Sequence, residues 1–177
     1  MSKWRTLSSE EIYKTPWIRV RRDEVLNHNG KPLTYSVVEL NNPSVFIVAT
    51  DPEGKVFMQR CYRYPIDKTI WNIPAGHSDG EDLLTAAKRE LLEETGLASE
   101  EWTRLGRLYQ AAGIGNIPLE AFWAKNVHAV SGDRDDLEEI VNQQFMTLEE
   151  IERLARSNEF EDAPELAVLY LAKLHGL

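Results

Sequence analysis

The chain has 177 residues, enough for one domain with an adequate core and a small appendage. Its 29 acidic residues outnumber its 20 basic residues and give a formal net charge of -9, which argues against non-specific binding of nucleic acids or anionic membranes as the main activity. Cys61 is the single cysteine, so an internal disulfide framework and a cysteine zinc cluster are excluded.

The N-terminal part of the chain predicts a β-hairpin. Residues 1–14 lack the apolar segment of a signal peptide, and no run approaches the roughly 18 apolar residues that span a bilayer, so we expect a cytoplasmic protein. Residues 17–26 and 33–40 alternate polar and apolar side chains, and an Asn-Gly turn at residues 28–31 joins them. A two-stranded hairpin is marginal alone, so it must dock on the main domain or on a second subunit.

The sequence Asn-Asn-Pro at residues 41–43 separates this extension, residues 1–42, from a main domain, residues 43–177. The main domain begins with a predicted buried strand at residues 44–50. A turn and a returning strand at residues 55–60 follow.

Two arginines among aromatic residues lie at the end of this returning strand. The segment QRCYRY, residues 59–64, contains Arg60 and Arg63, and guanidinium groups suit contacts with phosphates and bases. The same arginines could instead form surface salt bridges.

A long helix is predicted from Glu81 to Thr95, because this stretch has no Pro or Gly and is rich in strong helix formers. Gly96 supplies its end. At about 100 degrees per residue, the helix has a packing face and an adjacent acidic face. The predicted packing face contains Leu84, Ala87, Leu91 and Leu92, and the acidic face contains Glu90, Glu93 and Glu94.

The acidic face favours a divalent cation. Neighbouring like charges cost an isolated helix a few tenths of a kcal/mol per pair, and Mg2+ or Mn2+ would offset this repulsion. Arg89 is expected to orient one glutamate through a bidentate contact. The alternative is a solvated helix face with no metal, the usual meaning of a charged helix.

The rest of the chain predicts three strands, two loops and two helices. The glycine-containing loop at residues 110–116 and the acidic loop at residues 131–139 are the candidates for substrate contact. The helices are expected to cover the sheet and to do no chemistry, the first opening on a capping box at Thr147 and ending near Ser157. The strands are residues 102–109, 118–127 and 140–146, and the last helix follows Asp162 and Pro164 with an apolar face of Leu166, Leu169, Tyr170 and Leu174.

The stretch from Gly76 to Leu97 resembles the signature of the Nudix hydrolases: a glycine loop, a glutamate, then Arg-Glu-aliphatic-any-Glu-Glu-any-Gly-aliphatic. The matching residues are Gly76, Glu81, Arg89, Glu90, Leu91, Glu93, Glu94, Gly96 and Leu97. Four residues separate the first glycine from the first glutamate, one fewer than in the family. The resemblance implies an α/β fold, the Nudix α/β/α sandwich with a mixed sheet, here with an N-terminal antiparallel β-hairpin extension. It also implies an Mg2+ or Mn2+ site formed by the Ala75 carbonyl, Glu90, Glu93, Glu94 and the loop residue Glu138.

Within this family, the hairpin and the Gln59 to Arg63 segment look like those of ADP-ribose pyrophosphatases and related nucleoside diphosphate sugar hydrolases. Such a resemblance implies a homodimer through exchanged N-terminal strands and a general base on the acidic loop. Two positions depart from the ADP-ribose pattern: Asn72 replaces a glutamate, and Ala112 replaces a marker proline. The implied site residues are Glu139, Glu138, Asp136, Glu93 and Arg89 for catalysis, and Arg60, Arg63, Tyr35, Gly76, Gly113 and Asn116 for substrate binding.

The resemblance therefore implies a metal-dependent hydrolase that splits nucleoside diphosphate sugars, ADP-ribose and also GDP-mannose, into a nucleoside monophosphate and a sugar phosphate. One alternative is a nucleoside triphosphate pyrophosphatase that cleans the nucleotide pool. A second is a non-catalytic Nudix-fold regulator that binds nucleotides without turnover; such proteins generally lose signature glutamates or carry a DNA-binding module, whereas this chain keeps its glutamates.

Overall fold

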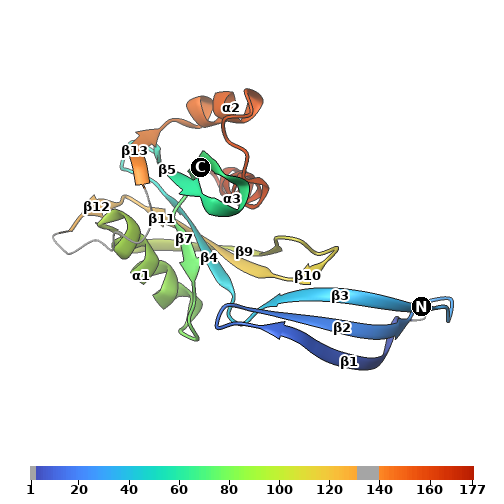
Figure 1. The fold of residues 1–177 in the computed structure, drawn as a ribbon. Coiled ribbons are helices and arrows are strands. Elements are labelled where there is room, and N and C mark those ends of the chain that lie inside the picture. The colour runs from blue at the N-terminus through green and yellow to red at the C-terminus, as the bar shows by residue number, and fades with distance from the viewer. Residues whose placement is uncertain (1–2, 131–139) are drawn as a thin grey trace. The chain divides into compact units, whose positions relative to one another are not determined.

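The computed structural model describes residues 3–130 and 140–177 (Figure 1). The chain forms two compact units, Met1–Pro43 with Tyr109–Pro118, and Ser44–Leu108 with Leu119–Leu177. The predicted domain boundary between residues 42 and 43 stays a prediction, and the contacts add Tyr109–Pro118 to the unit of the N-terminal strands. Within the described ranges, no helix is long and apolar enough to cross a membrane.

The first unit is a four-stranded sheet. Its strands, in spatial order, are β1 (Arg5–Lys14), β2 (Ile18–Leu26), β3 (Pro32–Leu40) and β10 (Gly115–Asn116). β2 and β3 form the predicted antiparallel hairpin, while β10 pairs parallel with β3. β1 pairs antiparallel with β2 and was not predicted, because its residues are all exposed and its apolar side chains do not alternate.

The second unit contains a mixed sheet. Its strands, in spatial order, are β7 (Ala75–His77), β4 (Ser44–Ala49), β11 (Pro118–Lys125) and β9 (Glu101–Tyr109). β4 pairs antiparallel with β7 and parallel with β11, which makes the sheet mixed as expected. β4 is buried along its whole length, as its uninterrupted apolar run predicts.

A second, antiparallel sheet carries the arginine segment. Its spatial order is β13 (Ile140–Met146), β5 (Val56–Arg63) and β6 (Lys68–Asn72), and a short 3-10 helix, η1 (Tyr64–Ile66), joins β5 to β6. The predicted returning strand therefore extends to Arg63 and pairs with β6 and β13, while a bridge between Thr50 and Val56 closes its turn. Two short strands, β8 (Leu97–Ala98) and β12 (His128–Ala129), form a further pair.

Three α-helices have local signals that explain their ends. α1 (Leu83–Thr95) begins after Asp82, whose carboxylate accepts the amides of Leu84 and Thr85, and it stops at Gly96 with φ 69°. α2 (Leu148–Arg156) opens on the predicted capping box of Thr147 and Glu150. α3 (Ala163–Leu174) begins after Asp162, which accepts the Glu165 amide.

Two apolar clusters fill the second unit, one on each face of β4. Phe46 and Val48 pack with α2 and α3, whereas Val45 and Ile47 pack with α1. Strands therefore lie between α1 on one side and α2 and α3 on the other, and the predicted sandwich is confirmed.

The predicted packing faces of two helices were partly wrong. In α3, Tyr170 and Leu174 are 62% and 64% exposed, because this helix is apolar around most of its circumference and the sequence pattern does not select one face. Its buried residues are Glu165, Val168, Leu169 and Ala172. In α1, Leu92 is exposed, and the buried residues are Ala86, Ala87, Leu91 and Thr95.

Candidate active site

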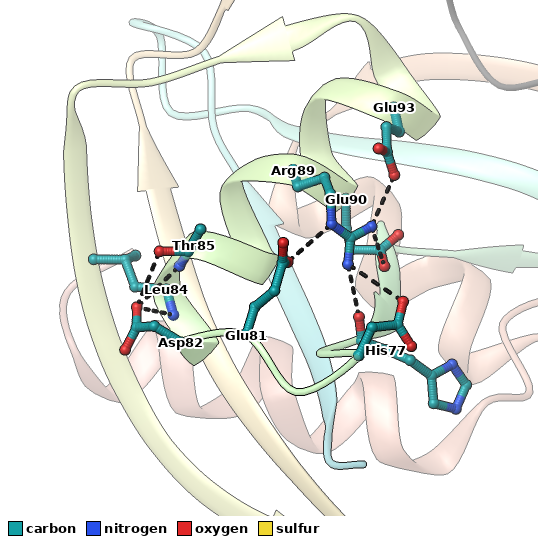
Figure 2. A network of polar contacts seen from close by, with 9 residues as sticks. His77, Glu81, Asp82, Leu84, Thr85, Arg89, Glu90 and Glu93 are labelled. Carbon is teal, nitrogen blue, oxygen red and sulfur yellow. Dashed lines mark hydrogen bonds and ion pairs between the residues drawn. The ribbon is translucent and has the colours of Figure 1, made fainter. Parts of the chain in front are cut away.

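Arg89 is the centre of the acidic face of α1. Figure 2 shows its guanidinium between Glu81, Glu90 and Glu93. Its Nε lies 3.0 Å from Glu81, and its Nη1 lies 3.0 Å from Glu90 and 2.8 Å from Glu93. The expected bidentate contact with one glutamate is thus replaced by three single contacts, and these contacts raise the pKa of Arg89 despite its partial burial. Arg89 stays charged and reduces the repulsion among three carboxylates.

The glycine loop also contacts Arg89, although it is one residue shorter than the family pattern. The His77 carbonyl accepts Arg89 Nη2 at 3.0 Å, while the His77 ring points away from the cluster (Figure 2). The loop then turns through Asp79 and Gly80, both with positive φ, and the Glu81 amide donates to the Ser78 carbonyl at 2.8 Å. The short loop therefore brings both a backbone carbonyl and Glu81 to the same guanidinium.

Glu90 lies directly over Gly76. A Cβ atom added at Gly76 would come closer than 3.0 Å to the Glu90 carboxylate, so the glycine is required by this close approach. The Glu90 side chain is only 13% exposed, and burial raises its pKa against the opposing effect of Arg89. A buried carboxylate whose negative charge is only partly compensated suits a cation.

Glu94, the third glutamate of the acidic face, contacts residues of the strands. Its Oε2 accepts Gln59 Nε2 at 2.8 Å and the Ala75 amide at 3.3 Å, and its backbone carbonyl accepts Gln143 Nε2 at 3.4 Å. Gln59 is fully buried, and its Oε1 finds no hydrogen-bond partner among the residues that the structure describes. An unpaired acceptor beside a carboxylate is compatible with a hydrated cation at this position.

The residues present fit a hard divalent ion in chemistry. The atoms that could coordinate a metal ion are all oxygens, and the glutamates of the cluster outnumber its single arginine. In residues 3–130 and 140–177, no group of three or more His, Cys, Asp or Glu side chains converges on one point, since Arg89 and Gln59 hold the carboxylates apart. The metal set of Ala75, Glu90, Glu93, Glu94 and Glu138 therefore stays a prediction.

Arg60 and Arg63 project from opposite faces of β5. They are three residues apart in a strand that pairs without interruption with β6, and side chains alternate with a period of two. Gln59, which reaches Glu94, shares its face with Arg63. Of the two arginines, Arg63 is therefore on the face of the acidic cluster, and Arg60 is exposed on the other.

Asn72 and Glu165 form a buried pair that was not predicted to belong to the site. Asn72 Nδ2 donates to Glu165 Oε1 at 2.9 Å, and the Ile73 amide donates to Oε2 at 2.7 Å. Burial raises the pKa of Glu165 well above its usual range. The departure at position 72 has a physical reason, since a glutamate there would meet the carboxylate of α3. Glu165 is the single acid of a mostly apolar helix, and this was the available signal.

Three predicted substrate residues lie in the first unit. Tyr35 donates its hydroxyl to the Gly113 carbonyl at 2.7 Å, and Asn116 belongs to β10 beside β3. Tyr35 also lines a cavity of about 250 Å³ together with Trp4, Asp23 and Val25, and the rings of Trp4 and Tyr35 meet edge to face. The structure thus brings Tyr35 and Gly113 together, while their contact with substrate stays a prediction.

The predicted general bases lie outside the described residues. Asp136, Glu138 and Glu139 belong to the acidic loop of residues 131–139, so their roles stay predictions.

Residues 40–168 match the NUDIX domain, and these residues comprise most of the chain. The chain belongs to the Nudix family. The N-terminal strands of this Nudix protein, residues 4–38, match a second family, the nucleoside diphosphate sugar hydrolase N-terminal domain. The predictions of a Nudix pyrophosphohydrolase and of its fold are confirmed.

Individual relatives of this Nudix protein resemble it along nearly their whole length. A protein of Bacillus subtilis (strain 168) named ADP-ribose pyrophosphatase is 31% identical over 170 residues, which cover 94% of this chain and 91% of that protein. The methanol dehydrogenase activator of Bacillus methanolicus is 28% identical over 173 residues, with the same two coverages. A solved structure, the crystal structure of an ADP compounds hydrolase, has a TM-score of 0.84 over 97% of this chain and 92% of that chain, at 23% identity, and supports the fold.

Proposed function

We propose that the protein hydrolyses the diphosphate bond of nucleoside diphosphate sugars, ADP-ribose first and GDP-mannose as a second substrate. The observation that carries the proposal is the set of glutamates arranged around Arg89, with Glu90 seated over Gly76. The match of residues 4–38 to the nucleoside diphosphate sugar hydrolase N-terminal domain and the ADP-ribose pyrophosphatase relative support this substrate class.

Glu90, Glu93, Glu94 and the Ala75 carbonyl would hold Mg2+ or Mn2+. When bound, such an ion neutralises phosphate oxygens and lowers the pKa of a coordinated water. Arg89 holds Glu90 and Glu93 in place, and the Gln59 amide holds Glu94. These contacts keep the carboxylates in one region of the site, and their convergence on an ion would require side-chain rotations.

The remaining steps belong to the predicted base and to Arg63. A carboxylate among Asp136, Glu138 and Glu139 accepts the proton of the attacking water, and Arg63 stabilises the phosphate charge. Cleavage then gives a nucleoside monophosphate and a sugar phosphate.

A substrate screen tests this function. We expect ADP-ribose to be hydrolysed faster than nucleoside triphosphates in Mg2+ or Mn2+, with GDP-mannose, UDP-glucose and diadenosine polyphosphates as comparisons, measured by phosphate release after phosphatase coupling. Preference for triphosphates would instead support the alternative of nucleotide-pool cleaning. Nucleotide binding without turnover of any diphosphate, unchanged by Glu93→Gln, would support a non-catalytic regulator.

We also propose that the N-terminal strands form a homodimer. β1 is the outer strand of its sheet, ten residues long and exposed throughout, with Leu7, Ile12 and Tyr13 each more than half exposed. A long exposed edge strand with unpaired backbone groups is normally paired or covered. Light scattering at micromolar concentration should give a mass of two chains. A mass of one chain would contradict the proposed homodimer.

A further inference from the structure

A line of polar side chains connects Arg63 to α3. Arg63 Nε donates to Asn72 Oδ1 at 3.2 Å, and Asn72 in turn donates to Glu165 at 2.9 Å. Asn72 is completely buried and Glu165 is 2% exposed, so solvent water is not available to replace these hydrogen bonds. The geometry of each member therefore depends on its neighbours.

The directions of the hydrogen bonds fix the orientation of the Asn72 amide. Both Glu165 oxygens accept from N–H groups, one from Asn72 and one from the backbone of Ile73. Asn72 must consequently turn its NH2 group toward Glu165, which leaves its oxygen for Arg63. A flipped amide would place NH2 against the Arg63 Nε–H and oxygen against the carboxylate, two unfavourable contacts.

The line lies beside the acidic cluster. Asn72 is the direct cross-strand partner of Gln59, and Gln59 holds Glu94 at 2.8 Å. Directly paired residues have Cβ atoms about 5 Å apart on the same face of the sheet. Arg63 is therefore linked to the wall of the site that carries Glu94.

We propose that Glu165 is a positioning residue which, through Asn72, orients the Arg63 guanidinium toward the diphosphate of the substrate. This inference rests on the proposed function and extends it to a residue on a helix that was expected to do no chemistry. Glu165 does not touch substrate; it acts through the amide that receives Arg63.

An exchange of chemical groups between positions 72 and 165 tests the proposal. In Asn72→Asp, two carboxyl groups meet in a buried place without the amide N–H that joins them now, and in Glu165→Gln, an NH2 group faces a donor. In the double variant, the new amide at position 165 donates to the new carboxylate at position 72 and still accepts from Ile73, while the carboxylate accepts from Arg63. Every hydrogen bond is restored, and only the one between positions 72 and 165 reverses its direction.

We expect each single variant to raise the KM for ADP-ribose by about tenfold with a smaller change in kcat, because substrate binding is weakened. The KM of the double variant should return to within about threefold of the value for the unmodified protein. In an Arg63→Lys background, Glu165→Gln should add no further increase in KM. Equal KM values in all four proteins, or a double variant as impaired as the worse single variant, would overturn the positioning role.

A spectroscopic readout separates this role from activity. In protein labelled with 15N-arginine, the Arg63 Nε–H signal is identified as the one that Arg63→Lys removes. We expect this hydrogen to exchange slowly with solvent in the unmodified protein and in the double variant, and faster in each single variant. If the unmodified protein hydrolyses no nucleoside diphosphate sugar, the proposed function fails while this signal still reports on Arg63. An Arg63 signal unaffected by folded single variants would contradict the inference, and if a single variant does not fold, the double variant still gives the decisive comparison.

Discussion

Glu90→Gln is expected to lower ADP-ribose turnover by about a thousandfold, the upper range for loss of one electrostatic group at a reacting centre. The Glu90 side chain is 13% exposed and its carboxylate lies over Gly76, so water solvates it little. The electrostatic attraction between this carboxylate and a bound cation would therefore be stronger than at an exposed site. The measurement is kcat with saturating Mg2+, compared with Glu100→Gln, an exposed glutamate outside the cluster.

The same variant should be at least as stable as the unmodified protein when no divalent ion is present. Burial raises the pKa of Glu90 above the ordinary value of 4.5, so its ionised form is less favourable in the folded than in the unfolded chain. The contribution of this group to stability is complete below the unfolded pKa and is lost as the pH rises through the folded pKa. Glutamine, which stays neutral, avoids this loss at neutral pH.

Divalent ions should reverse the order of stability. A ligand present at 100 times its Kd stabilises a folded protein by about 2.7 kcal/mol, and Glu90→Gln should lose much of this gain. Thermal unfolding with chelator and with Mn2+ measures both effects. A variant that keeps full turnover, or that gains as much stability from Mn2+ as the unmodified protein, would exclude Glu90 from the metal site.

The helix that carries Glu90 was predictable because its signals are local. Strong helix formers between residues 81 and 95, the stop at Gly96 and the spacing of the glutamates all lie within a few turns of each other. The first residue of the helix, the exposure of Leu92 and the side-chain rotamers escaped prediction. A helical wheel groups Glu94 with Glu90, yet Glu94 turns to Gln59, a residue 35 positions earlier in a strand.

Contacts between distant segments were not predictable from the residues. Asn72 and Glu165 are 93 positions apart, and no local pattern pairs them. The orientation of the two arginines was also not predictable from the motif. Arg60 and Arg63 lie in one sequence segment, but side chains alternate along a strand, so the two arginines lie on opposite faces. Strand pairing, and not residue type, decides which of them can share a face with Gln59.

Gly76→Ala is expected to lower turnover on the order of a hundredfold without unfolding the protein. The added methyl group would occupy space now held by the Glu90 carboxylate, which is the end of a flexible side chain and can swing away. A displacement of about 1 Å at a reacting centre costs on the order of a hundredfold in rate. Gly76 is not among the residues with positive φ, so alanine can adopt its backbone conformation and the free energy of unfolding should change by less than about 1 kcal/mol.

A second substitution distinguishes this steric mechanism from a general disturbance of the loop. Glu90→Asp shortens the side chain by one methylene group and retracts the carboxylate from the new methyl group. Gly76→Ala combined with Glu90→Asp should therefore lose less activity than the product of the two separate losses, because both changes act on the same carboxylate. If the loss of activity in the double variant equals the product of the two separate losses, the glycine is required by the backbone of the loop and not by the close approach of Glu90.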